Sequence, residues 1–339
     1  KNGYVSIEEI PMPNINDNEI LIETTKTIIS AGTERMLAEF GRSNWISKAS
    51  QQPDKVKQVI AKARTNGIFN TLDTVLAKLD EPLPLGYCNV GNVIKVGRSV
   101  SFFKPGDRVV SNGYHSEIVV VPEKLCAKIP KNVKDEEAIF TVLASIGLQG
   151  IRLAEPTIGE VFVVSGLGLI GILTAQVLIS GGMKVIGIDP DNKKLQLANN
   201  FGIKTFLPEN IENLYSYLDK ETSGNGVDGV IVTATTKSSD PIHLAAEICR
   251  KRGRIILVGV TGLNLNRELF YKKEIKFQVS CSYGPGRYDP SYEIESKDYP
   301  FGFVRWTEQR NFQAILNLLS DKKLITNSLI THQYNFNKI

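Results

Sequence analysis

Residues 161–191 constrain the fold of this 339-residue chain more than any other stretch. They begin with an apolar run over 161–164, which is continuous rather than alternating, as in a strand buried on both faces of a parallel sheet. A glycine turn that fits G-x-G-x-x-G follows at once: Gly166-Leu167-Gly168-Leu169-Ile170-Gly171. An apolar helical face comes next, and a second apolar strand over 184–188 ends at Asp189. This order predicts a β-α-β unit.

The glycine turn predicts a dinucleotide site. The first two glycines let the backbone approach a pyrophosphate, and the third lets helix and strand pack tightly. The helix N-terminus offers free N–H groups to the anion. Asp189, about 20 residues on, can accept hydrogen bonds from an adenosine ribose and would repel a 2′-phosphate. We therefore predict NAD(H) rather than NADP(H), although Lys193 and Lys194 lie close enough in sequence to serve a phosphate.

The rest of the chain predicts about two domains. Before the unit, short strand-like segments at 4–10, 19–29, 85–97 and 103–122 are separated by turn signals, which is typical of a small β-barrel. A block of helical period from about 37 to 82 interrupts them; it could be a solvated face, a lid or a dimerisation surface. After the unit, apolar runs at 226–234 and 253–259 extend the parallel sheet, whose strand ends bring Thr233 and Gly259 toward the glycine turn.

Composition excludes several classes of protein. The 40 basic and 36 acidic residues leave a net charge of +4, and no basic stripe is interleaved with aromatics, so no nucleic-acid partner is expected. No apolar run reaches the about 18 residues of a membrane span, and no signal-peptide pattern is present, so we expect a cytoplasmic enzyme. The cysteines lack C-x-x-C spacing, which argues against a disulfide framework or zinc lobe; Cys126, Cys249 and Cys281 are predicted to be buried thiols.

This order of segments resembles the medium-chain dehydrogenase/reductase superfamily, the alcohol-dehydrogenase-like fold. The residues that carry the resemblance are Phe103-Lys104-Pro105-Gly106-Asp107-Arg108-Val109, the glycine fingerprint with Asp189, and Gly226-Val227-Asp228-Gly229-Val230. The resemblance implies an α/β chain with two domains. A GroES-like β-barrel catalytic domain would span 1–140 and 281–339, with 37–82 as a helical insertion. A Rossmann doubly wound parallel sheet would span 141–280.

Three further segments resemble the dehydrogenase half of bacterial bi-domain oxidoreductases: Ser30-Ala31-Gly32-Thr33-Glu34-Arg35-Met36, Pro84-Leu85-Gly86-Tyr87-Cys88-Asn89-Val90-Gly91, and Ser282-Tyr283-Gly284-Pro285-Gly286-Arg287-Tyr288-Asp289-Pro290. In those proteins a Gfo/Idh/MocA-type sugar oxidoreductase domain follows, and they are associated with surface-polysaccharide or sugar metabolism. The resemblance implies that this chain is a fragment of such a protein. It also implies a homodimer, since family members often pair through the edge strand of the dinucleotide domain.

The sequence differs from the family at the positions that bind the catalytic zinc ion. Zinc members carry a Cys, a His followed by Glu, and a second Cys. The matching positions here are Ser30, the sequence Gly86-Tyr87-Cys88, and Ala144-Ser145. One thiol cannot make a three-ligand zinc site with an open fourth position, so we expect no zinc.

Without a metal, hydride transfer still needs a group that takes or gives the hydroxyl proton. Tyr87 stands at the lost ligand position, and His115 aligns with a position that lines the substrate pocket. Ser30 and Thr33 lie on the turn where zinc members keep a proton-relay hydroxyl. Tyr87 and His115 each have a plainer interpretation, as a packed tyrosine and a hydrogen-bonded histidine. Glu34 could be a base, although capping the following helix fits it better.

The resemblance also places a basic residue of the late glycine-rich loop against the pyrophosphate, and Arg287 suits that role. The predicted function is a zinc-independent, NAD(H)-dependent oxidoreductase acting on a polar, sugar-derived alcohol or carbonyl compound. Two alternatives remain open: an NADPH-dependent quinone or enoyl reductase, and a non-catalytic domain that senses NAD(H) for an attached enzyme.

Overall fold

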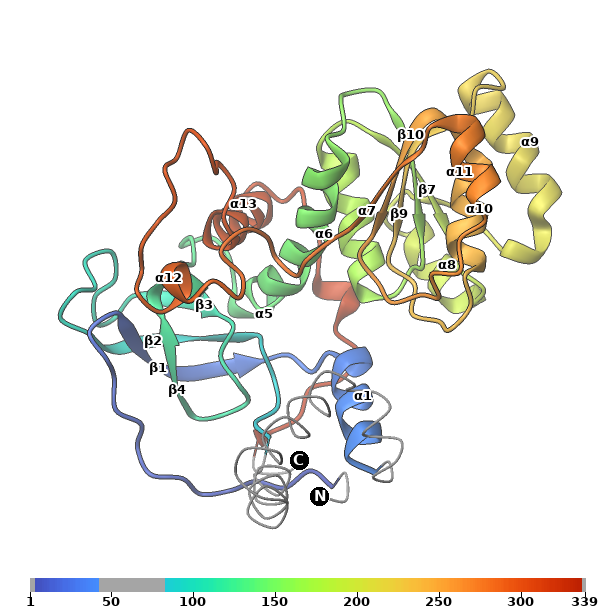
Figure 1. Cartoon of the computed structure of the whole chain (residues 1–339). Coiled ribbons are helices and arrows are strands. Elements are labelled where there is room, and N and C mark those ends of the chain that lie inside the picture. The colour runs from blue at the N-terminus through green and yellow to red at the C-terminus, as the bar shows by residue number, and fades with distance from the viewer. Residues whose placement is uncertain (1–3, 43–82, 337–339) are drawn as a thin grey trace, which may run out of the picture.

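The computed structural model describes residues 4–42 and 83–336. It contains a five-stranded antiparallel sheet in the order β4-β1-β2-β3-β5 and a six-stranded parallel sheet in the order β11-β10-β9-β6-β7-β8. Figure 1 shows the antiparallel sheet at lower left and the parallel sheet with its helices at upper right. The expected pairing of a small β domain with a doubly wound α/β domain is confirmed.

The β domain carries its strands close together in the sequence. Its elements are β1 (Glu19–Thr27), α1 (Ala31–Arg42), β2 (Asn89–Val96), β3 (Arg108–Ser111), β4 (Ile118–Pro122), the 3₁₀ turn η1 (Glu123–Leu125), β5 (Cys126–Lys128) and α5 (Asp135–Ala138). The helical period predicted from residue 37 is found in α1, and the rest of the 37–82 block, from 43 on, lies outside the described residues.

The strand predicted at 4–10 is wrong. Residues 4–16 form no strand, and Tyr4 and Val5 are 80% and 60% exposed. β1 is already hydrogen-bonded on one side to β2 and on the other to β4, so the segment before it finds no free edge on its neighbour in the chain. Pro11 and Pro13 also interrupt the run, because proline cannot donate to a ladder.

The α/β domain begins where the chain leaves the antiparallel sheet. Its elements are α6 (Thr141–Ala154), β6 (Val161–Ser165), α7 (Leu169–Ser180), β7 (Lys184–Ile188), α8 (Asn192–Asn199), β8 (Lys204–Phe206), η2 (Pro208–Asn210), α9 (Ile211–Thr222), β9 (Val227–Val232), α10 (Asp240–Ile248), β10 (Cys249–Leu257), α11 (Arg267–Lys273) and β11 (Lys276–Val279). All five residues of β6 are buried, as the continuous apolar run predicts. β6 lies between β7 and β9, so the strand order reverses beside it, which is where such sheets bind ligands.

The chain then returns toward the β domain through α12 (Pro290–Glu293), α13 (Glu308–Ser320) and η3 (Asn327–Leu329). Figure 1 shows α13 between the two sheets, where it packs on α6 and on β5. One hydrophobic core runs from the antiparallel sheet through α6 and α13 to α7 and one face of the parallel sheet. The domain boundaries at 140/141 and 280/281 stay a prediction.

The structure tests the expected burial of the cysteines and the expected absence of a membrane span. All four cysteines are free; Cys126 and Cys249 are buried as predicted, but Cys281 is exposed, because it follows β11 at the edge of the sheet. Among the described residues, no helix has the length and apolar character needed to cross a membrane.

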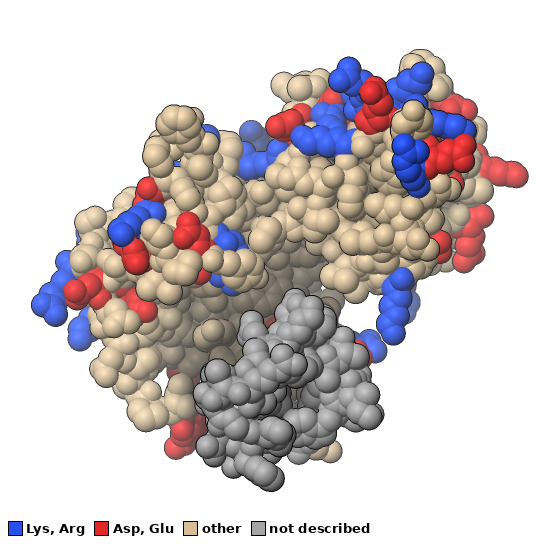
Figure 2. Space-filling model, viewed as in Figure 1, with Lys and Arg blue, Asp and Glu red and all other residues tan. Residues whose placement is uncertain are grey.

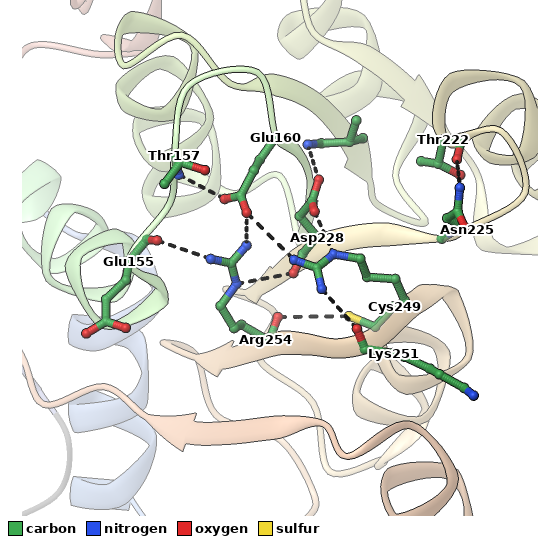
Figure 3. A network of polar contacts seen from close by, with 12 residues as sticks. Glu155, Thr157, Glu160, Thr222, Asn225, Asp228, Cys249, Lys251 and Arg254 are labelled. Carbon is green, nitrogen blue, oxygen red and sulfur yellow. Dashed lines mark hydrogen bonds and ion pairs between the residues drawn. The ribbon is translucent and has the colours of Figure 1, made fainter.

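A charged network braces the amino-terminal ends of the parallel strands (Figure 3). Arg254 in β10 pairs with Glu160, just before β6, at 2.6 Å from Nη2 to Oε1, and both side chains are 14% exposed. Nη1 of the same arginine donates to the Glu155 carbonyl at 3.1 Å. Arg250 pairs with Asp228 of β9, from Nε to Oδ1 at 2.7 Å. This network ties β6, β9, β10 and the end of α6 together, at the edge opposite the glycine turn.

Replacing Arg254 with Met should therefore destabilise the protein by about 3 kcal/mol, because Glu160 keeps its charge but loses its main partner. Urea unfolding of Arg254→Met measures the loss. Arg252→Met is the matched control, since Arg252 is 81% exposed and should cost no more than about 0.5 kcal/mol. Equal effects of the two substitutions would contradict the bracing role.

Candidate functional site

The glycine turn has the geometry that its sequence predicts. Gly166 adopts φ +99°, which favours glycine, and its N–H donates to the Ile188 carbonyl at 2.7 Å. A Cβ on Gly171 would lie 1.8 Å from the Gly166 carbonyl oxygen, so the third glycine is needed for close packing. Gly168 precedes α7, has no side-chain cap, and would meet nothing within 4 Å of an added Cβ. The start of α7 thus has no side-chain cap, and there is room beside Gly168 among the described residues.

Asp189 is tied directly to this turn. It lies just after β7 and is 3% exposed. Its Oδ2 accepts a hydrogen bond from the backbone N–H of Leu167 at 2.7 Å, and its Oδ1 accepts from Asp191 N–H at 2.9 Å. Nζ of Lys194 lies 3.5 Å from Oδ2. The carboxylate is thus held beneath the fingerprint, beside one of the two lysines that the sequence places nearby.

The neighbouring strand ends also support the turn. Thr233, just after β9, donates its hydroxyl proton to the Gly166 carbonyl at 2.5 Å. A Cβ on Gly259, after β10, would lie 2.1 Å from the Ala234 carbonyl oxygen, so these two strand ends approach closely. The structure therefore brings Thr233 and Gly259 to the glycine turn, and their contact with a cofactor stays a prediction.

On the β-domain side, His115 pairs with Glu34. Nε2 of His115 lies 3.2 Å from Oε1 of Glu34, and the two side chains are 15% and 11% exposed. The same Oε1 accepts the backbone N–H of Ser30 at 3.1 Å, which is the capping role expected of Glu34 at the start of α1. His115 N–H donates to the Leu85 carbonyl at 2.8 Å. Sequence reasoning missed the pair, whose members are 81 positions apart.

The histidine ring rests on a glycine. Gly86 adopts φ +89°, and a Cβ there would lie 2.7 Å from Nδ1 of His115. Nδ1 is buried and has no hydrogen-bond partner among the described residues. An ionised carboxylate only accepts hydrogen bonds, so with Glu34 in that form Nε2 carries the proton and Nδ1 keeps its lone pair. The ring thus has one oriented nitrogen and one nitrogen available for a proton.

The other predicted catalytic residues gather at the same junction without forming a metal site. Tyr87 is half-buried against the core, and Ser30 is half-buried at the N-cap of α1. The side chain of Thr33 lies outside what the structure describes. Cys88 is fully buried, and burial, with the nearby charge of Glu34, raises the pKa of its thiol well above the usual value.

The family that the sequence resembles commonly holds zinc at this junction. Zinc needs three protein ligands there, with cysteine bound as a thiolate. In the described part of the chain, no three His, Cys, Asp or Glu side chains are grouped to hold a metal ion. The residues present do not fit a zinc site.

Arg287 lies in the loop between β11 and α12, and its guanidinium forms an ion pair with the last residue of α12. Its Nη1 pairs with Oε1 of Glu293 at 2.6 Å. The guanidinium also lies 5.3 Å from the ring centroid of Tyr283 and 4.2 Å from that of Tyr288. The predicted contact of Arg287 with a pyrophosphate stays a prediction.

The glycine turn belongs to the α/β domain, and the pair His115–Glu34 belongs to the β domain. Figure 2 shows basic and acidic side chains mixed at both ends, and between the domains a hollowed surface with few charged groups on this face. Such a recess suits an uncharged, polar substrate better than a polyanion.

Comparison with known proteins gives two family matches. Residues 56–131 match the alcohol dehydrogenase GroES-like domain, and residues 169–295 match the zinc-binding dehydrogenase family. A sorbitol dehydrogenase of Halalkalibacterium halodurans is 24% identical over 75% of this chain and 77% of its own length. A D-guloside 3-dehydrogenase of Escherichia coli is 28% identical over 73% of this chain and 68% of its own. The crystal structure of galactitol-1-phosphate dehydrogenase from Escherichia coli shares the fold, with a TM-score of 0.70, 20% identity, and coverage of 98% of this chain and 90% of that one.

The contact between Gly86 and His115 can be tested with a pair of glycine substitutions. Gly86 and Gly106 have φ of +89° and +88°, so alanine strains both backbones alike, but nothing lies within 4 Å of a Cβ on Gly106. Gly86→Ala should cost about 1–3 kcal/mol more than Gly106→Ala, because the imidazole must move. Urea unfolding measures the difference, and the ring resonances of His115 should shift only in Gly86→Ala. Equal costs with unmoved resonances would show that the ring does not rest on Gly86.

Proposed function

Because the chain belongs to the medium-chain dehydrogenase/reductase superfamily and is an oxidoreductase, we propose that it is zinc-independent and NAD(H)-dependent. Its substrate would be a polar, sugar-derived alcohol or carbonyl compound. The observation that carries the proposal is the open face of Gly168 at the start of α7, with Asp189 fixed beneath the same turn.

The turn and the helix end would hold the cofactor. The N–H groups that begin α7 would bind the pyrophosphate, since Gly168 at the N-cap provides no side-chain cap. Asp189 still has acceptor capacity for ribose hydroxyls, because each carboxylate oxygen can accept more than one hydrogen bond. When bound, the nicotinamide would exchange a hydride with the carbinol carbon of the substrate.

His115 would handle the hydroxyl proton. As hydride leaves the carbinol carbon, Nδ1 of His115 takes the hydroxyl proton, and Glu34 stabilises the resulting imidazolium through Nε2–H. In the reverse direction Nδ1–H returns the proton to the forming alkoxide. Tyr87 and Ser30 would supply hydroxyl groups that orient the substrate, and Thr33 stays a candidate from the sequence for the same role. We propose no step through a zinc ion, because the described residues at this junction do not supply its ligand set.

The names of the relatives support the substrate class. The sorbitol and D-guloside dehydrogenases act on polyols and sugars, as their names state, and the uncharged recess is compatible with such compounds. The competing proposal is an NADPH-dependent quinone or enoyl reductase, and the observation in its favour is Lys194 beside Asp189, where a 2′-phosphate would lie.

We extend the proposal to the oligomeric state, the cellular location and an attached domain of the enzyme. We propose a homodimer that pairs through an edge strand of the parallel sheet and works in the cytoplasm on small molecules. In the natural protein a Gfo/Idh/MocA-type domain would follow this chain, with a role in surface-polysaccharide biosynthesis.

Fluorescence titration with NADH and NADPH tests the cofactor site. Gly168→Ala should weaken NADH binding tenfold or more, about 1.4 kcal/mol, because its methyl group fills the open face, while the melting temperature stays unchanged. Gly302→Ala, at another glycine with nothing within 4 Å, should leave NADH binding intact. Tighter binding of NADPH than NADH would favour the reductase, and binding of neither would contradict a nucleotide site.

Turnover with sugar alcohols and nucleotide sugars tests the chemistry. His115→Ala should reduce kcat about 100-fold or more, the usual contribution of a general acid or base, while NADH affinity changes little. Tyr87→Phe, which keeps the ring, serves as the comparison for a residue that only orients. An unchanged rate in both variants would rule out these proton-transfer roles, and the absence of turnover in the wild type would favour the sensing domain.

A further inference from the structure

Glu308, the first residue of α13, is a fully buried carboxyl group without a hydrogen-bond partner. It is 0% exposed, and neither of its oxygens has a partner among the described residues. Its own backbone N–H donates to the Pro285 carbonyl at 2.9 Å, so the start of α13 is fixed against the loop after β11. A buried carboxylate in this situation would lose its hydration without compensation, so a neutral carboxylic acid is strongly favoured.

The neighbouring charges also favour the protonated form of Glu308. Arg287 is the one cation of the described structure that acts on Glu308, and its Nη1 is already paired with Glu293 at 2.6 Å. Nε of Arg287 is buried and has no hydrogen-bond partner in the described part of the chain. Two carboxyl groups therefore share a single guanidinium, and one of them must hold a proton for the cluster to stay neutral. Burial raises the pKa of Glu308 to about 9; Glu293 adds to the rise, and Arg287 opposes it.

The cluster borders the junction between the domains. The ring of Tyr283 lies 5.3 Å from the Arg287 guanidinium and 5.3 Å from the ring of Phe312, one turn after Glu308 in α13. The phenol oxygen of Tyr283 lies 3.5 Å from Nδ2 of Asn112, which follows β3 in the antiparallel sheet. Tyr283 is 3% exposed.

Burial raises the pKa of Tyr283, with Arg287 and Asn112 opposing the rise and the charges of Glu308 and Cys88 adding to it. Through its phenol oxygen, Tyr283 thus connects the α13 cluster to Asn112, three residues before His115 in the sequence.

We propose that Glu308 is a positioning residue: its proton sets the charge of the buried cluster and, through Arg287, the electrostatic field at Tyr283 beside the reaction site. With Glu308 neutral, the guanidinium faces one carboxylate and Tyr283 experiences a balanced cluster. When Glu308 loses its proton to solvent, an uncompensated negative charge appears beside the phenol. The effect on hydride transfer rests on the proposed function; the protonation and its influence on Tyr283 do not.

The groups that face Glu308 come from several segments. Glu293 and Tyr292 belong to α12, Arg287 and Tyr283 to the loop before it, and Tyr299 to the loop after it. Of these, only Glu293 and Arg287 carry charge at neutral pH, and they are paired with each other. The ionisation of Glu308 is therefore the event that changes the net charge of the cluster near pH 9.

Infrared spectroscopy of the full chain tests the protonation directly. The difference between wild type and Glu308→Gln should contain the carbonyl band of a protonated carboxylic acid at pH 7, which should disappear with a midpoint of about 9. In Glu293→Gln, the matched control, Arg287 becomes free to pair with Glu308, so the band should disappear at a lower pH. Absence of the band from wild type at pH 7 would overturn the proposal.

Thermal unfolding gives a second readout of the same proton. Between pH 4.5 and about 9 the folded state keeps a proton that the unfolded state releases, so this group lowers stability as pH rises across that window. Glu308→Gln lacks this pH-dependent contribution to stability. Its melting temperature should match wild type near pH 4.5 and exceed it by several degrees at pH 9, whereas parallel curves would overturn the protonation.

Carbon NMR of the chain labelled at tyrosine Cζ tests the effect on Tyr283, whose signal is identified by Tyr283→Phe. In wild type this signal should shift with a midpoint of about 9, and in Glu308→Gln it should not. A signal indifferent to pH in both would reduce Glu308 to a structural role and overturn the proposal. Turnover, where found, should fall above pH 9 in wild type and not in Glu308→Gln. If no substrate is turned over while the infrared and NMR results hold, the proposed function fails and the role of Glu308 toward Tyr283 stands.

Discussion

The close backbone approach at the glycine turn is the constraint on which the rest of the α/β domain depends. Gly171 sits so near the Gly166 carbonyl that no side chain fits, and Thr233 bonds the same carbonyl from the next strand. The Leu167 N–H is at the same time taken by Asp189. Three strand ends are thereby joined through one loop, and the helix that follows is left with its first N–H groups unused. The hydrogen bonds of Thr233 and Asp189 thus hold the turn, and the N-cap Gly168 adds no side-chain cap to the helix.

The β domain contributes a histidine whose position is fixed by its neighbours. Its histidine is held by a carboxylate from α1 and a carbonyl from the loop before β2, and its ring occupies space that only a glycine leaves free. The carboxylate orients the ring through Nε2, the carbonyl holds the backbone of His115, and Nδ1 lies buried against Gly86. A scaffold that orients a histidine in this way resembles the arrangement in which a carboxylate sets the tautomer and position of a general base. Where the superfamily commonly relies on a metal, this chain presents an oriented imidazole and a tyrosine.

Local features were predictable from the sequence, and distant pairings were not. The glycine fingerprint, Asp189 and the buried strand β6 follow from residue types at short spacing, because turn and strand geometry constrain neighbouring residues directly. The pair Glu34–His115 and the cluster of Arg287, Glu293 and Glu308 depend on how separate loops meet, which no periodicity records. The strand expected at 4–10 failed for a related reason: alternation describes a segment that could pair, but the partners of β1 were already in place.

The hydrophobic core that α6 and α13 share with both sheets limits how the two halves of the protein can move. Domains connected only by linkers swing about hinges, whereas close-packed side chains resist separation and permit small sliding displacements of helices. Opening and closing around a substrate would therefore proceed by shear of α13 against α6. Such a motion would carry the start of α13 together with the loop after β11, to which the Glu308 N–H is bonded, so the buried carboxyl would keep its surroundings while the domains shift.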